Sequence, residues 1–274
     1  MRLAGVMEVS RSGYYDWLRR PMSQRRRDDT RLIQEIKRIS IESAQTYGRP
    51  RILQELLNHG YHISPRRVQR LMKEADIKVV SNKKVRMRTT DSRHHLPVSA
   101  NLLKRNFHAQ KANQIWASDI TYIRTHQGWA YLCIILDLYS RRIVGWSIRD
   151  HLRATLVTES LAMAFRKRRV VALSLIFHSD RGSQYASDTV RAVLRENSII
   201  SSMSSTGDCF DNAVAESAFG TIKTERVYSQ CYESVTEARR DMFRYFEGFY
   251  NRRRMHSYLG YLSPEEFEMK NEAA

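Results

Sequence analysis

Three apolar, β-rich stretches follow one another closely in the middle of the chain, and their spacing limits the possible folds more than any other feature. They span residues 114–125, 129–140 and 142–149, with Gly128 between the first two and Ser140-Arg141 between the next two. Connections as short as these join antiparallel strands. The sequence therefore predicts a three-stranded antiparallel meander.

The segments that follow alternate between helical and strand patterns. Residues 154–168 carry apolar residues at helical spacing, and the next apolar stretch is short and ends in His178-Ser179-Asp180. A helix is predicted at about 188–197, a strand at about 200–205 and another helix from about Asn212. This order predicts an α/β fold, with a mixed five-stranded sheet between flanking helices.

A helical tail is predicted after this α/β part. A long helical tract covers about 234–252, and Ser263 with Glu266 has the spacing of a capping box that opens a last short helix. Four aromatic residues in the long tract are predicted to pack in a core rather than to stack on bases: Tyr245, Phe246, Phe249 and Tyr250.

Positive charge is concentrated in the first part of the chain. Residues 1–107 carry 24 Lys and Arg against 10 Asp and Glu, a net charge of +14, whereas residues 108–274 carry 22 against 19, a net charge of +3. A basic excess points to nucleic acid or to an anionic membrane surface. The longest apolar run, residues 131–136, is far shorter than a bilayer span, so nucleic acid is the favoured partner.

The N-terminal residues and the cysteines argue against a secretory signal and against a disulfide or zinc framework. The N-terminal residues MRLAGVMEVS contain no sustained apolar region, so no secretory signal is expected. Cys133, Cys209 and Cys231 are odd in number, widely spaced and without a CxxC pair. Neither a disulfide framework nor a structural zinc site is indicated, and a reducing cytoplasm is expected.

Residues 28–77 have the pattern of three short helices, the third opened by Ser64-Pro65. Its basic residues Arg66, Arg70 and Lys73 follow at i, i+4 and i+7, opposite an apolar face. Three helices with a basic last one suit a helix-turn-helix module, although such residues also fit a solvated helix face. The surrounding charge favours DNA contact. The apolar stripes of the first two helices are Leu32, Ile33, Ile36 and Ile39, and Ile52, Leu53, Leu56 and Leu57.

Three acidic residues occupy distinctive places in the α/β part. Asp119 lies in the first strand, Asp180 lies at the end of the fourth, and Glu216 follows after 35 intervening residues in the first turns of a helix. Carboxylates from such positions can converge at one sheet edge, and a cluster of hard oxygen ligands is what Mg²⁺ prefers. Two such ions, roughly 3.5–4 Å apart, can promote an in-line phosphodiester displacement.

Each acid also fits an ordinary role when it is taken alone. Asp119 fits a partly solvated strand edge, Asp180 a turn beside Gly182, and Glu216 a charge that complements the helix dipole. Three further acids are interpreted as having no role in the triad. Asp137 is expected to be structural or to support the triad from just outside it, because no triad role remains for it. Asp208 and Asp211 are expected to shape the loop before the last core helix.

Several motifs in order give the three acids a specific context. The stretch from about 108 to 265 contains WASDITYI, LDLYSRRIVGW, HSDRGSQY, FDNAVAESAFGTIK and FYNRRRMHSYLGYLSPEEFE. In these motifs and in the 35-residue spacing, the chain resembles the catalytic core of bacterial insertion-sequence transposases of the OrfB type, which are related to retroviral integrases. Residues 28–77 resemble the helix-turn-helix segment that precedes this core.

The resemblance implies an RNase H-like fold and a DNA transposase that cleaves and transfers strands of an insertion sequence. It implies that Asp119, Asp180 and Glu216 are catalytic and hold two Mg²⁺ ions, for which Mn²⁺ can substitute, and that Lys223 contacts DNA. The seven residues from Glu216 to Lys223 span almost two helical turns, which agrees independently. The expected partners are insertion-sequence ends, target DNA, further copies of this chain and an upstream OrfA-type product, in a bacterial, nucleoid-associated cytoplasmic setting.

Five segments make up the predicted domain organisation. They are an N-terminal extension at 1–27, the helix-turn-helix domain at 28–77, a basic linker at 78–107, the catalytic core at 108–232 and the helical tail at 233–274. The linker contains Lys83, Lys84, Arg86, Arg88 and Arg93. The tail contains a basic cluster of Arg252, Arg253, Arg254 and His256, which suits phosphate contact and fits a solvated helix end nearly as well. Arg252 and Arg253 are its candidate DNA contacts.

Three other functions share some of these features. His178 and Arg181 spell the HxxR of tyrosine recombinases, but that class places the motif on a helix and needs no acidic triad. An RNase H-type nuclease would share the fold and metals without strand transfer. A catalytically silent DNA-binding regulator would keep the fold, but it has no need of all three carboxylates.

Overall fold

The computed structural model describes residues 10–80, 96–205 and 209–272. The chain divides into two compact units, Met1–Val79 and Val80–Ala274, called the N-terminal and C-terminal units below. Most of the basic residues of the predicted linker, Lys83 to Arg93, lie outside the described residues.

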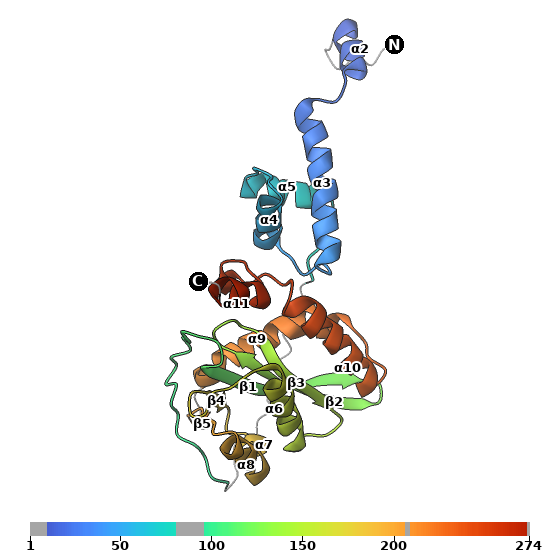
Figure 1. The fold of residues 1–274 in the computed structure, drawn as a ribbon. Helices are drawn as coiled ribbons and strands as arrows, with labels where there is room; N and C mark the ends of the chain where they lie inside the picture. The colour runs from blue at the N-terminus through green and yellow to red at the C-terminus, as the bar shows by residue number, and fades with distance from the viewer. Residues whose placement is uncertain (1–9, 81–95, 206–208, 273–274) are drawn as a thin grey trace. The chain divides into compact units, whose positions relative to one another are not determined.

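The N-terminal unit is helical (Figure 1). It contains α2 (Arg11–Arg19), α3 (Gln24–Glu42), α4 (Arg49–Asn58) and α5 (Pro65–Glu74). The Ser64 hydroxyl accepts a hydrogen bond from Arg67 N at 3.3 Å, and Pro65 occupies the first helical position, so the predicted start of α5 is confirmed. The last three helices pack on one another through Leu32, Ile36, Ile39, Ile52, Leu56, Val68, Leu71 and Met72, all of them buried.

Two sequence expectations for this unit were wrong in detail. The first predicted helix begins at Gln24 rather than near residue 28, because the Ser23 hydroxyl caps it by accepting from Arg26 N. Leu57 was expected in the apolar stripe but is 43% exposed. A helix turns about 100° per residue, so Leu57 lies one step around from the inward-facing Leu56. The predicted extension also holds a helix, α2, which Ser10 caps.

A five-stranded mixed sheet forms the centre of the C-terminal unit, with strand order β3-β2-β1-β4-β5. The pairs β1–β2 and β2–β3 are antiparallel, whereas β1–β4 and β4–β5 are parallel. The predicted meander and mixed sheet are therefore confirmed. The strands are β1 (Ile115–Thr125), β2 (Gly128–Asp137), β3 (Ile143–Arg149), β4 (Ile176–Ser179) and β5 (Ile200–Met203).

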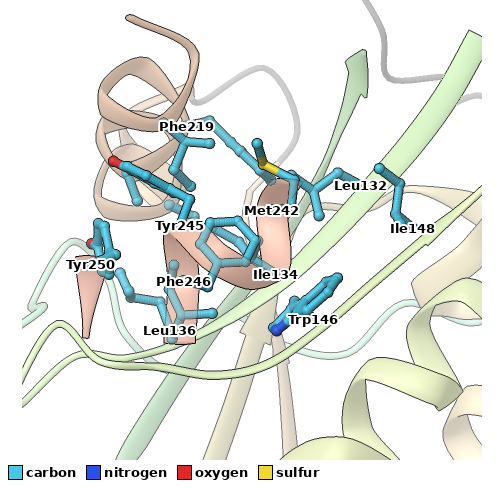
Figure 2. Packing of buried hydrophobic residues seen from close by; sticks show 14 of the residues in the cluster. Leu132, Ile134, Leu136, Trp146, Ile148, Phe219, Met242, Tyr245, Phe246 and Tyr250 are labelled. Carbon is cyan, nitrogen blue, oxygen red and sulfur yellow. The ribbon is translucent and has the colours of Figure 1, made fainter. Parts of the chain in front are cut away.

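Helices cover both faces of this sheet (Figure 1). On one face α6 (Thr155–Lys167) and α8 (Asp188–Glu196) pack over residues that include Trp116, Cys133 and Ile135. On the other, α9 (Ala213–Glu225) and α10 (Val235–Phe243) pack over Leu132, Ile134 and Leu136 (Figure 2). The alternation along β2 therefore fills two separate cores.

The tail completes the second core. After α10 the chain continues as a π-helix, η3 (Arg244–Tyr250), whose Tyr245, Phe246 and Tyr250 are buried, as predicted (Figure 2). Phe249 is only partly buried. A short turn η4 (Ser257–Leu259) precedes α11 (Pro264–Glu272). The capping box is confirmed, because Ser263 N donates to Glu266 Oε2 at 2.8 Å and Glu266 N donates to Ser263 Oγ at 3.3 Å.

Polar contacts attach the tail to the sheet. The Asn251 side chain bonds both backbone groups of Ile143 in the edge strand β3, accepting from its N–H at 2.9 Å and donating to its carbonyl at 3.0 Å. Glu268, only 4% exposed, accepts from Ser140 Oγ at 2.6 Å and from Arg142 Nη1 at 2.7 Å, and also pairs with Arg168. These contacts hold the tail against the β2–β3 connection.

Replacing Glu268 with alanine is expected to destabilise the protein by about 3–5 kcal/mol, because the largely buried Arg168 would lose its partner. The measurement is urea unfolding followed by circular dichroism. Met269→Ala is the matched control, since Met269 lies next on α11 and is 62% exposed. Equal unfolding midpoints for the two variants would contradict this account of the tail.

Candidate active site

Strand register brings the first two acids to the same sheet edge. In the parallel pairing of β1 with β4, Ala117 lies opposite His178. Asp119 follows Ala117 by two positions, and Asp180 follows His178 by two positions, directly after β4 ends at Ser179. Because side chains alternate along a strand, two positions return each acid to the face of its strand that carries Ala117 or His178.

The third acid comes from a helix on that face. Glu216 lies in the first turn of α9, and Ala215, Ala218, Phe219 and Ile222 of this helix are buried in the same core as Ala117 of β1. Glu216 itself is exposed, and Lys223, seven residues further along α9, is partly exposed. The packing of α9 therefore sets the position of both charged groups.

The four charged groups influence one another. Burial raises the pKa of the Asp119 carboxyl well above its usual value, and the negative charges of Asp180 and Glu216 raise it further, while Lys223 opposes them. Partial desolvation of its carboxylate raises the pKa of Glu216, although the residue as a whole is exposed, and the charge of Asp180 raises it further. Burial lowers the pKa of Lys223, and Asp119 acts in the opposite sense. The structure therefore brings the three predicted acids and Lys223 into one electrostatically interacting site.

Asp119 and Asp180 line one pocket. Each carboxylate accepts a nearby backbone N–H: Asp119 Oδ1 from Ile120 N at 2.7 Å, and Asp180 Oδ1 from Gly182 N at 3.0 Å. A side chain at position 182 would crowd this turn, since its Cβ would lie 3.1 Å from Asp180 Oδ1. The other lining residues are Ile120, Tyr122, Leu152, Gln184 and Tyr185.

None of those other lining residues was predicted from the sequence. Tyr185 lies in the short helix α7 (Ser183–Ala186) and is buried. The Ser118 hydroxyl donates to Ile134 O at 2.8 Å, so the Tyr185 hydroxyl, 2.9 Å from Ser118 Oγ, donates to it. The only sequence signal for Tyr185 was its place in the HSDRGSQY motif beside Asp180.

The donor set suits a hard cation, because carboxylate oxygens are the ligands that Mg²⁺ prefers. Mutual repulsion, which raises the pKa of both Asp119 and Glu216, is what a bound cation would relieve. Among the described residues, no three His, Cys, Asp or Glu side chains are grouped closely enough to hold one ion together. The carboxylates are therefore neighbours without forming a ready-made cage.

A buried histidine supports the start of α9. His178 Nε2 donates to the carbonyl oxygen of Asp211 at 2.8 Å, and its Nδ1 lies 2.9 Å from Ser202 Oγ in β5. The Asp211 carboxylate accepts from Ser205 N and from Asn101 Nδ2, both at 2.8 Å. Asp211 thus shapes the loop, as predicted, while Asp208 lies outside the described residues. His178 is fully buried and is not available at an open recombinase site.

Asp137 is structural, as the sequence indicated. It is fully buried, and its two carboxylate oxygens accept from Asn113 N at 2.8 Å and from Tyr139 N at 3.0 Å. Burial raises the pKa of this carboxyl to about 6. It holds the turn that follows β2.

The basic residues predicted to contact DNA differ in their surroundings. Arg66 and Lys73 are exposed on α5. Arg70 is also exposed, but its guanidinium lies 2.7 Å from the buried Asp29 and 3.2 Å from Glu74. Burial alone would raise the pKa of Asp29, and hydrogen bonds from Arg70 and Arg67 hold it below its usual value. Arg70 therefore has a structural partner that its position on the helix did not reveal.

The basic cluster predicted in the tail is divided. Arg252 and Arg253 are exposed, and Arg252 Nε lies 3.6 Å from Glu265. Arg254 and His256 are buried, and Arg254 donates to Glu225 at the end of α9 at 2.7 and 2.6 Å. The four residues therefore do not form one basic surface, because Arg254 makes an internal ion pair with Glu225 that joins the tail to α9.

Family comparisons agree with this architecture. Residues 26–85 match the HTH-like domain, and residues 109–209 and 197–264 match two descriptions of the integrase core domain. The chain thus has the domain content of DNA-acting proteins, which combine a helix-turn-helix-like domain with an integrase core. Among the described residues, no helix is long and apolar enough to cross a membrane.

Two relatives that align with nearly the whole chain show which family within this class it belongs to. The chain is 41% identical over 265 residues to the 31 kDa protein of insertion element IS600 from Shigella sonnei, covering 97% of each. It is 38% identical over 268 residues to the transposase InsF for insertion sequence IS3A from Escherichia coli (strain K12), covering 97% of this chain and 92% of that protein. The chain belongs to the IS3 family of insertion-sequence transposases.

Solved structures similar to this chain include the catalytic core domain of BIV integrase. That alignment has 15% identity and a TM-score of 0.44, and it covers 59% of this chain and 97% of the other.

Replacing Asp119 with asparagine is expected to stabilise the protein at pH 7 by about 0.5–2 kcal/mol. Because its pKa is raised in the folded state, ionisation of Asp119 costs stability as the pH rises above about 4, where Asp ionises in the unfolded chain. The gain should therefore vanish below that pH.

Thermal unfolding between pH 3.5 and 8 in EDTA measures this effect. Asp150→Asn is the matched control, since Asp150 is an exposed acid directly after β3. An Asp119→Asn variant that is no more stable than the Asp150→Asn control at pH 7 would show that burial and repulsion of the ionised Asp119 carboxylate do not cost the protein stability.

Proposed function

We propose that this transposase cuts and joins DNA strands by metal-dependent, in-line phosphodiester displacement, with Asp119, Asp180 and Glu216 as its catalytic residues. The observation that carries the proposal is their meeting from β1, the end of β4 and α9 at one sheet edge, where their charges interact. Membership of a transposase family supports the same chemistry.

The three carboxylates would hold two Mg²⁺ ions, with Mn²⁺ as a substitute. When bound, such ions activate a water or 3′-hydroxyl nucleophile and stabilise the leaving oxygen. Asp119 and Asp180 line one pocket, so ions held by their carboxylates would lie where the attacked phosphate enters. Lys223 brings an ammonium group near Asp119, where it would contact a DNA phosphate.

DNA would be held by other parts of the chain. Arg66 and Lys73 on α5 are exposed and would contact phosphates, with Arg252 and Arg253 adding contacts near the core. Arg70 would contribute while it remains paired with Asp29. We further propose the domain boundaries given by the sequence, assembly of several copies on DNA ends, and cooperation with an upstream OrfA-type product.

Strand cleavage and joining on a labelled DNA end test the chemistry. Wild type is expected to form products with Mg²⁺ or Mn²⁺ and none with EDTA, and Glu216→Gln is expected to lose at least about 100-fold in rate, because it keeps the side-chain shape but removes a metal-binding charge. Glu196→Gln, an exposed glutamate on α8, is the matched control.

The products separate the alternatives. Cleaved ends without joined strands would favour an RNase H-type nuclease, and DNA binding without any cleavage would favour a silent regulator. Activity that persists in EDTA with tyrosine-linked DNA would contradict the proposal outright. A wild-type rate in Glu216→Gln would contradict the assignment of Glu216.

Binding of the full chain to duplex DNA should weaken with salt, because Lys and Arg displace condensed counterions from phosphates. Arg66→Ala and Lys73→Ala are each expected to reduce the slope of log K against log salt by about 0.9. Fluorescence anisotropy at several KCl concentrations measures the slope. Lys37→Ala, exposed on α3, serves as control, and unchanged slopes for both α5 variants would exclude this face as the phosphate contact.

A further inference from the structure

An aromatic and basic band lies on the β1–β2 hairpin, outside the carboxylate site. It consists of Tyr122 and Arg124 in β1 and Trp129 and Tyr131 in β2. The register places Tyr122 opposite Tyr131 and Arg124 opposite Trp129. Residues opposite each other in an antiparallel pair point to the same face, so the four side chains form one surface, called the aromatic band below.

The rings of the aromatic band contact one another edge to face. The ring centroids of Tyr122 and Tyr131 are 5.0 Å apart, and those of Tyr122 and Trp129 are 6.1 Å apart. The Arg124 guanidinium lies over the Trp129 ring, 5.9 Å from its centroid. Trp129 is 38% exposed, so the outer part of the band faces solvent.

The band meets the candidate active site at one pocket. It lies on the face of the sheet that α6 and α8 cover, whereas Asp119 alternates to the face that α9 covers. Tyr122 lines the same pocket as Asp119 and Asp180. The register pairs β4 with β1 at Ile115–Ala117, before β1 reaches Asp119. From Asp119 onward β1 therefore runs past the end of its parallel neighbour, and the band extends from the pocket along this part of the hairpin.

The charge and chemistry of the band fit an unpaired nucleotide. Aromatic rings with an adjacent arginine are how proteins stack and hold single-stranded bases. Arg124 is exposed and its guanidinium lies over the Trp129 ring, so its charge is placed beside the rings where a phosphate can reach it. A second copy of this chain would bring the same strongly positive net charge of +17, which favours a polyanion as the occupant.

We infer that the aromatic band stacks an unpaired base of the DNA strand whose phosphate enters the pocket, with Trp129 and Tyr122 as the stacking residues and Arg124 as a phosphate contact. This inference rests on the proposed function, which requires a strand end at Asp119 and Asp180. A base inside a duplex hides its flat face, so the band would select frayed or overhanging ends over paired DNA.

DNA binding measured under conditions that prevent cleavage tests the inference. The probe is a duplex oligonucleotide with a short single-stranded 3′ overhang that carries 2-aminopurine, and EDTA prevents cleavage. Stacking on the wild-type protein is expected to quench the 2-aminopurine. Trp129→Leu and Tyr122→Leu are each expected to lose about 5- to 100-fold in affinity for the overhang and most of the quenching. Trp129→Phe and Tyr122→Phe, which keep a ring, should retain most of both.

Two controls separate stacking from general effects. Affinity for a blunt duplex should stay unchanged in all four variants. Tyr258→Leu should behave as wild type, because Tyr258 is likewise an exposed aromatic beside an arginine, with the Arg141 guanidinium 4.2 Å from its ring centroid, but lies away from the hairpin. Equal losses for blunt and overhanging DNA, or an equal effect of Tyr258→Leu, would overturn the inference.

Photocrosslinking keeps the inference testable if leucine variants fail to fold. A 5-iodouracil placed in the overhang should crosslink wild-type protein to the peptide spanning residues 115–137, and crosslinks confined to other peptides would overturn the assignment. Because neither assay needs metal, failure of the band is distinguishable from failure of the proposed catalysis. Normal quenching without metal-dependent cleavage would support base stacking on the aromatic band and contradict the proposed catalysis.

Discussion

The parallel pairing of β1 with β4 decides where the charged groups of the C-terminal unit can meet. It joins Ala117 to His178, residues separated by the rest of the meander and by α6, so that the acids two positions beyond each arrive at one edge. Because β4 ends at Ser179, Asp180 lies just outside the sheet. Asp119, at the matching position, is still part of β1. A shift of one residue in either strand would turn its carboxylate to the opposite face.

Holding like charges together opposes folding, and the surrounding structure has to offset that cost. The apolar side of α9 is buried against the sheet, His178 ties the loop before α9 to β4 and β5, and Arg254 binds the last turn of α9 through Glu225. Both ends of the helix that carries Glu216 are therefore fixed by groups outside it. This arrangement is typical of functional sites, where an unfavourable local feature persists because the surrounding contacts hold it in place.

Much of the fold and the three acids could be predicted because the signals are local. Short connections define the meander, and each acid lies beside a recognisable strand end or helix start. What escaped prediction depends on distant partners. Arg70 pairs with Asp29, 41 positions away in the sequence, and Arg254 pairs with Glu225, 29 positions away. The aromatic band depends on the register between β1 and β2. Hydrophobic periodicity alone carries no information on such pairs.

The side chain of Asn251 has a consequence for how the protein is made. Its amide presents to Ile143 the donor and the acceptor that a neighbouring peptide group would present, and so it closes part of the outer edge of β3. An open strand edge is a template for pairing with other chains. Since 108 residues separate the two partners, a nascent chain emerging from the ribosome completes β3 long before it can cover it. During that interval the outer edge of β3 at Ile143 lacks the two hydrogen bonds that the Asn251 amide supplies in the finished protein.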